Sequence, residues 1–154
     1  MLNLFIKKIL MANVSTYLNF PTQTEEVFNY YKSIFGGEFS EPVMRFKDMP
    51  PQEGSPAPSE QLGNMIMHIE YPIVGGHKLM GTDAPAEMGF KVNVGNNSYI
   101  MLDLDSKEEA DRIFNGLSSG GKVEMPLADM FWGAYYGSLA DKYGVQWMIN
   151  VSKS

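Results

Sequence analysis

Two residues of one short segment have side chains suited to proton transfer. His68 and Glu70 are separated by one residue in the stretch 64–71, so on a strand both would lie on the same face. An imidazole beside a carboxylate can act as an acid–base pair next to a carbonyl group. A buried Glu70 would have a pKa that is raised or set by its partners. We therefore predict His68 and Glu70 as catalytic candidates, with a hydrogen-bonded structural role for His68 as the alternative.

The composition argues against several other chemistries. The chain has 154 residues with two histidines and no cysteine, which excludes disulfides, thiol catalysis and thiolate metal sites. The lack of cysteine suits a reducing compartment, and we predict a cytoplasmic protein. A formal net charge of −6 argues against a nucleic-acid partner. No apolar run reaches the roughly 18 residues of a membrane span, and no G-x-G-x-x-G, P-loop, nucleophile elbow or H-E-x-x-H motif is present.

An internal repeat organises these residues. Thr22 and Ser106 each begin the sequence pattern of a capping box and lie 84 positions apart. Glycine pairs that would end the two helices keep the same offset. The further pairs at this offset are Gly36 and Gly120, Leu18 and Leu102, Phe20 and Leu104, and Pro42 and Pro126. A register shared by strand, helix start, helix end and proline indicates a duplication.

Each half of the repeat reads as β-α-β-β-β, so we predict an α+β fold of two modules. Apolar residues at helical spacing follow each capping box, and the segments around the helices alternate. The predicted strands are 17–20, 64–71, 77–82, 99–104, 131–140 and 145–151. The predicted units are an N-terminal extension 1–11, module 1 over 12–88 with a proline-rich loop 48–61, and module 2 over 96–152. That loop is either a surface connection or a lid over a pocket.

Four strings resemble the vicinal oxygen chelate superfamily, and within it the PhnB-like branch. They are YLNF (17–20), TEEVFNYYKSIFGGEF (24–39), MHIEYPIVGGHKLMGTD (67–83) and FWGAYYGSLADKYGVQWMIN (131–150). The superfamily includes glyoxalase I, bleomycin-resistance proteins and extradiol dioxygenases, and PhnB-like members sometimes carry a demethylubiquinone methyltransferase name. The resemblance covers nearly all of 13–152. It implies a glyoxalase/bleomycin resistance fold, with a curved mixed sheet around a central cavity that is usually completed in a homodimer.

The resemblance also implies where a metal would be held. Metal-dependent members place His and Glu ligands on the first and last strands of each module, because these groups suit divalent ions. By alignment those positions fall near 15–17 and at Met80, Tyr99 and Met148. None of these residues is His, Asp or Glu. We therefore predict no metal cofactor, although a divalent metal bound by a displaced set of ligands stays open.

Strand alternation predicts which other side chains face the cavity. If Leu18 and Leu102 pack beneath the helices, their neighbours along each strand point the other way. A hairpin centred on Gly75 would also place Glu70 opposite Met80. The predicted ligand-binding residues are Tyr17, Asn19, Met80, Tyr99, Met101, Trp132 and Met148. Trp147 is next to Met148 on the same strand and so points to the opposite face, and we therefore predict that it packs in the core.

These residues favour a binding function. Methionine and aromatic side chains adapt to apolar guests, and we predict metal-free binding of an apolar or aromatic small molecule in a cavity shared by a homodimer. One alternative is a glyoxalase- or dioxygenase-like lyase or isomerase that uses a divalent metal or the His68/Glu70 pair. Another is a dimeric fold whose own side chains fill the cavity. The predicted partners are a small molecule and a second copy, with no nucleic acid and no membrane.

Overall fold

The computed structural model describes residues 12–152, which form two βαβββ modules. Module 1 consists of β1 (Thr16–Phe20), α1 (Thr24–Phe35), β2 (Met44–Arg45), β3 (Ile66–Pro72) and β4 (Lys78–Asp83). Module 2 consists of β5 (Ile100–Asp103), α3 (Lys107–Ser118), β6 (Lys122–Asp129), β7 (Tyr135–Ala140) and β8 (Gln146–Val151). The predicted fold class is confirmed, whereas the predicted extension 1–11 lies outside the described residues.

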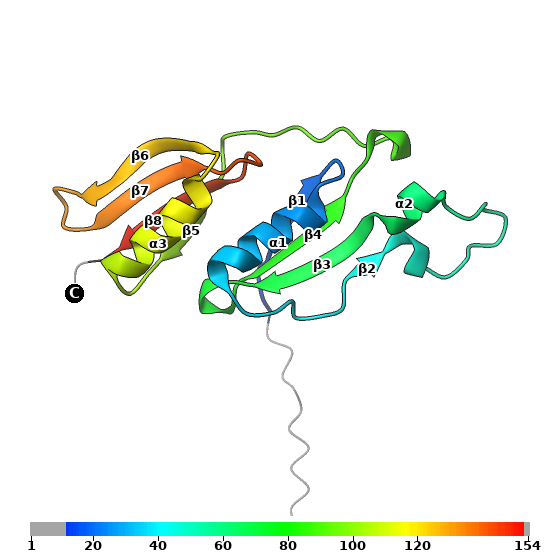
Figure 1. Ribbon diagram of the computed structural model, residues 1–154, viewed down its shortest axis with the longest axis horizontal. Coiled ribbons are helices and arrows are strands. Elements are labelled where there is room, and N and C mark those ends of the chain that lie inside the picture. Colours follow the sequence, from blue (N-terminus) through cyan, green and yellow to red (C-terminus); the bar gives the residue numbers. More distant parts are fainter. Residues whose placement is uncertain (1–11, 153–154) are drawn as a thin grey trace, which may run out of the picture.

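Each module builds its own four-stranded mixed sheet. The strand orders are β1-β4-β3-β2 and β5-β8-β7-β6, with β1–β4 and β5–β8 parallel and the other pairs antiparallel. Among the described residues β1 and β5 are edge strands that do not pair with each other, so the two sheets stay separate. Figure 1 shows the modules side by side, with α1 and α3 in contact at their junction.

The two helices begin in different ways. Ser106 accepts a hydrogen bond from the Glu109 backbone N–H at 3.2 Å, which confirms the cap predicted for α3. The cap predicted at Thr22 is wrong, because α1 starts two residues later and no neighbouring side chain caps it. A buried carboxylate from β4 takes this role, since Asp83 Oδ1 accepts from the Thr24 N–H at 3.0 Å. Its Oδ2 accepts from the Ile66 N–H at 2.8 Å, so Asp83 joins α1 to the start of β3.

A single hydrophobic core runs through both modules. Trp147 is fully buried on the helix side of β8, as predicted, and the Tyr31 ring of α1 meets it edge-on at 5.4 Å. Beside them lies Asp141, which is 4% exposed and accepts hydrogen bonds from Tyr31 Oη at 2.7 Å and Trp147 Nε1 at 3.0 Å. Module 1 is therefore attached to the β7–β8 turn through a satisfied buried carboxylate.

Several short elements between the main strands and helices were not predicted from alternation in the sequence. The edge strands β2 and β6 were not among the predicted strands, and β6 contains Pro126, which an edge strand tolerates. Residues 49–59 form no helix or strand, but α2 (Glu60–Asn64) starts inside the predicted loop and Ser59 caps it. Single turns of 3-10 helix cover Phe46–Asp48, Val74–Gly76 and Ala86–Met88. No helix in the described part of the chain is long and apolar enough to cross a membrane.

Candidate functional site

The face of each sheet that is turned away from its helix is called the helix-free face here. In module 1 a row crosses this face at one level, because Tyr17 of β1 aligns with Met80 of β4, and Met80 pairs with Glu70 of β3. The predicted pairing of Glu70 with Met80 is therefore confirmed. Tyr17 is 50% exposed although its neighbour Phe20, on the other face, is buried. The helix-free face thus presents an aromatic and a thioether side chain to solvent.

His68 lies next to Tyr17 on the same face. The Tyr17 hydroxyl is 3.3 Å from His68 Nδ1, and the two ring centroids are 5.9 Å apart. Met44 of β2 lies opposite His68 in the register and is 40% exposed. Asn19 occupies the next position of this face along β1, beside Thr82 of β4. The sequence analysis did not identify Met44, because β2 is too short to show alternation.

Glu70 is held by partners that the sequence analysis did not identify. Its carboxylate accepts hydrogen bonds from Lys78 Nζ at 2.6 Å and Ser40 Oγ at 2.7 Å, and His68 Nε2 lies 4.0 Å from it. The hydrogen bonds from Lys78 and Ser40 lower the pKa of Glu70, and they outweigh its burial. The partners of Glu70, and not its burial, therefore set the direction of its pKa. A carboxylate stabilised in its charged form is a weak proton acceptor.

The helix-free face of module 2 repeats this arrangement with other residues. Met101 of β5, 51% exposed, aligns with Met148 of β8, and Met148 pairs with Ser138 of β7. Tyr99 precedes β5, and its hydroxyl donates to Glu124 Oε2 at 2.6 Å. Because β5 and β6 are the two edges of this sheet, the Tyr99 and Glu124 side chains together reach across it. The hydrogen bond to Glu124 raises the pKa of the Tyr99 hydroxyl.

Trp132 stands apart from the rows described above. It lies in the turn between β6 and β7 and is 56% exposed. Its ring contacts Phe131, which is 98% exposed, and lies 6.2 Å from the ring of Tyr136. Tyr136 pairs with Asn150 of β8, so the aromatic pair is at the end of the helix-free face.

The residues at the aligned metal positions do not form a conventional divalent site. Tyr17 and Met80 lie side by side in module 1, Tyr99 and Met148 lie on the same face of module 2, and thioether groups are poor ligands for hard divalent ions. Within residues 12–152 no three His, Cys, Asp or Glu side chains cluster closely enough to hold a metal ion. The donor set of this chain therefore does not fit the metal that the superfamily implies.

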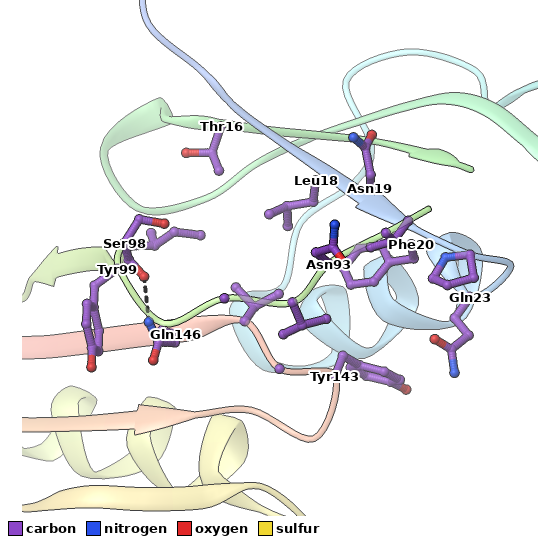
Figure 2. A pocket seen from close by; sticks show the side chains of 17 residues that line it. Thr16, Leu18, Asn19, Phe20, Gln23, Asn93, Ser98, Tyr99, Tyr143 and Gln146 are labelled. Carbon is purple, nitrogen blue, oxygen red and sulfur yellow. Dashed lines mark hydrogen bonds between the residues drawn. The ribbon is translucent and has the colours of Figure 1, made fainter. Parts of the chain in front are cut away.

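Two of the hollows between the modules adjoin the helix-free faces, because residues of those faces also line them. The larger, of about 470 Å³, includes Asn19 and Tyr99 among its lining residues (Figure 2). The second, of about 400 Å³, is lined by Tyr99 and Met101 together with His77, whose Nε2 is 2.8 Å from Thr16 Oγ1. Strand alternation did not predict either hollow, because both arise where the two modules pack together.

The predicted site residues fall into three groups. Tyr17, Asn19, His68, Glu70 and Met80 share the helix-free face of module 1. Tyr99, Met101 and Met148 share that of module 2, and Trp132 lies beyond its end. Of these residues, Asn19 and Tyr99 are both among the residues that line the larger hollow between the modules.

Comparison with known proteins identifies the family of this chain. The profile of a family described as 3-demethylubiquinone-9 3-methyltransferase matches residues 12–150. Protein YjdN of Escherichia coli (strain K12) is 31% identical over 149 residues, which cover 91% of this chain and 95% of YjdN. The chain belongs to this family.

Solved structures support the same placement. The crystal structure of protein PA1353 from Pseudomonas aeruginosa is similar at a TM-score of 0.78, with 33% identity over 94% of this chain and all of that one. A Bacillus cereus structure described as a 3-demethylubiquinone-9 3-methyltransferase, PhnB protein, reaches a TM-score of 0.69 at 24% identity, covering 92% of this chain and all of that one. A glyoxalase/bleomycin resistance protein from Albidiferax ferrireducens T118 shares the fold at a TM-score of 0.56 and 14% identity, covering 90% and 97% of the two chains. This PhnB- and YjdN-like chain therefore has a glyoxalase-like fold.

Proposed function

We propose that this PhnB-like protein binds an apolar or aromatic small molecule on its helix-free faces without a metal. The observation that carries the proposal is the exposure of large apolar side chains at matching places in the two modules. Tyr17 and Met101 are 50% and 51% exposed on the two edge strands, each beside a methionine of the neighbouring parallel strand. Mobile thioether groups next to a phenol ring suit a planar apolar guest.

The polar groups of module 1 would orient such a guest. Tyr17 and His68 are hydrogen-bonding groups at the solvent side of the face, and either could contact a carbonyl or hydroxyl oxygen of the ligand. Glu70 is already neutralised by Lys78, so it adds little net charge to this face. A site with an apolar surface and few polar groups is the usual form of a small-molecule site.

We also propose that a second copy covers the helix-free faces. In a single chain these faces expose methionine and tyrosine side chains, and a second copy would enclose a guest bound between them. Light scattering on the purified protein should give twice the mass of one chain. A monomer at all concentrations would contradict this part of the proposal.

A neutral aromatic probe tests the binding site. With 1-naphthol, we expect the melting temperature to rise with probe concentration, because the probe binds only the native state. Tyr17→Ala and Met101→Ala should each weaken binding about fivefold by removing apolar contact. The matched control is Val123→Ala, since Val123 is 43% exposed but pairs with Leu139 of the core and so lies on the other face. Equal effects of all three variants would contradict the proposed site.

Metal content gives an independent test. Protein purified without chelator should contain no stoichiometric divalent metal, and added Zn²⁺ or Mn²⁺ should leave the binding of 1-naphthol unchanged. Stoichiometric zinc, nickel, manganese or iron that is lost together with naphthol binding would refute metal-independent binding.

A second candidate function is acid–base catalysis by His68. The observation in its favour is the line of groups from the Tyr17 hydroxyl through His68 to the Glu70 carboxylate, at 3.3 Å and 4.0 Å. In such a line the imidazole would move the proton and the carboxylate would orient it, as in a lyase or isomerase step beside a carbonyl. On any substrate found, His68→Gln should abolish turnover and leave the melting temperature unchanged. Full activity of this variant would refute the role.

A further inference from the structure

The larger hollow between the modules lies mainly on the helix side of β1, although Asn19 and Tyr99 of the helix-free faces are also among its lining residues. It lies where β1 and the residues after it, the connection 92–100 and the β7–β8 turn 143–146 come together (Figure 2). Leu18 and Phe20 of β1 line it, and both belong to the side of the strand that packs toward the core. The hollow, called the inter-module cavity below, therefore opens at the edge of the first sheet on its helix side.

The walls of the inter-module cavity carry no formal charge. All of its lining residues are neutral, in a chain whose net charge is −6. The apolar part of the wall comes from Leu18, Phe20, Val92, Val94, Ile100 and Val145. The polar part includes the carboxamides of Gln23, Asn93 and Gln146. A charged guest would lose hydration here without gaining an opposite charge, whereas a neutral polar guest could hydrogen-bond to the amides.

Most of these carboxamides are not used to hold the fold together. Gln23 directly precedes α1, yet its side chain does not cap the helix. Among the lining residues, Figure 2 draws one hydrogen bond, in which Gln146 Nε2 donates to the Ser98 carbonyl at 2.9 Å. Gln23 and Asn93 therefore offer both donors and acceptors at the cavity wall, since each carboxamide has both, whereas the Asn19 side chain points to the other side of β1 from Leu18 (Figure 2).

The connection contacts the region of the β7–β8 turn at two points. Gly144 has a φ of +87°, and a Cβ atom there would lie 2.7 Å from Val94 Cγ1, so the turn and the connection touch at a point that only glycine allows. The hydrogen bond between Gln146 and Ser98 holds the same connection a few residues further on. A cavity of about 470 Å³ has the size of a small-molecule site.

We propose that the inter-module cavity is a second binding site, for a neutral molecule that combines a planar apolar part with an amide or hydroxyl group. Its walls come from both modules, so a bound molecule would stabilise their docking as well as the native state. The proposed site differs from the one on the helix-free faces, because Leu18 and Phe20 of the cavity wall lie on the opposite side of β1 from Tyr17.

Three probes of the same shape and different charge test the chemistry. Benzamide, benzoate and benzylammonium would each be titrated to about 10 mM, a range that suits fragment-sized ligands, against ¹⁵N-labelled full-length protein. We expect benzamide to shift the side-chain amide signals of Gln23 and Asn93 and the backbone signal of Gly144. The two charged probes should bind at least about fivefold more weakly.

A charge placed in the cavity provides the matched variant. Asn93→Asp keeps the size of the side chain and should weaken benzamide binding while strengthening benzylammonium binding. Asn29→Asp makes the same change at an exposed position of α1 that does not line the cavity, and it should alter neither probe. Benzamide shifts confined to Tyr17, His68 and Met80 would overturn the second site and leave the first supported. Benzoate binding as tightly as benzamide, or no shift with any probe, would also overturn it.

Discussion

Asp141 joins the two modules, and its replacement by asparagine should destabilise the whole chain. Its Oδ1 accepts from the backbone N–H groups of Tyr143 at 2.9 Å and Val145 at 3.1 Å, and its Oδ2 accepts from Tyr31 and Trp147. An asparagine that keeps its oxygen toward the backbone turns an NH₂ group toward the indole N–H, which can only donate.

The expected cost follows from those four hydrogen bonds. One buried indole donor loses its acceptor, and the other donors lose a charged partner, where each hydrogen bond to a charged group contributes about 1.5–3 kcal/mol. Because the losses are not additive, we expect Asp141→Asn to lower the free energy of unfolding by about 3–5 kcal/mol. Urea unfolding followed by far-UV circular dichroism and by tryptophan fluorescence measures this change.

A surface carboxylate serves as the control for this prediction. Asp111 also accepts a hydrogen bond from a tyrosine, Tyr135, but at an exposed position, so Asp111→Asn should cost less than about 1 kcal/mol. If Asp141→Asn does not fold, Tyr31→Phe removes one donor only and should cost about 1–3 kcal/mol. An Asp141→Asn protein as stable as the Asp111→Asn protein would refute the reasoning.

Three further predictions concern pH and packing. The pKa of Glu70 lies below its ordinary value of 4.5. The stabilisation by the Glu70 carboxylate is therefore complete above pH 4.5 and disappears as the pH falls through the lowered pKa. Lys78→Met should raise the pKa of Glu70, which a ¹³C NMR titration would measure. Burial beside a carboxylate raises the pKa of Tyr31 well above 10.0. Its stabilising contribution is therefore complete below pH 10 and is lost as the pH rises from there towards the raised pKa. Tyr31→Phe should reduce the loss of stability that urea unfolding measures above pH 10. A Cβ at Gly81 would lie 2.7 Å from a ring of α1, so Gly81→Ala should cost about 1–3 kcal/mol, whereas Gly95→Ala, whose nearest contact is at 3.6 Å, should be nearly neutral.

Strand alternation predicted the faces of the sheets because it depends only on neighbouring residues. Leu18 and Leu102 are in or against the core and Tyr17 and Met101 are on the helix-free faces, as the period of two requires. The pairing of Glu70 with Met80 followed equally from the position of one glycine turn. These features are local, and the sequence determines them without knowledge of the rest of the chain.

Contacts between distant residues could not be predicted in this way. The start of α1 depends on Asp83, which is 59 positions further along the chain, and the local pattern at Thr22 suggested a cap that does not form. The pKa of Glu70 is controlled by Ser40, 30 positions earlier, and by a lysine of the next strand. Alternation gives no information on which polar side chains will meet, since that depends on how the elements pack.

The division between core and helix-free faces makes the binding predictions testable by substitution. The buried apolar side chains lie between the helices and the sheets, so truncating one of them would create a cavity and destabilise the fold. Tyr17 and Met101 are about half exposed, so their replacement by alanine should change the free energy of unfolding by less than about 1 kcal/mol. A loss of ligand binding in these variants would then report on the ligand site itself. Trp147, fully buried beside Asp141, provides the fluorescence signal that shows whether each variant has kept its fold.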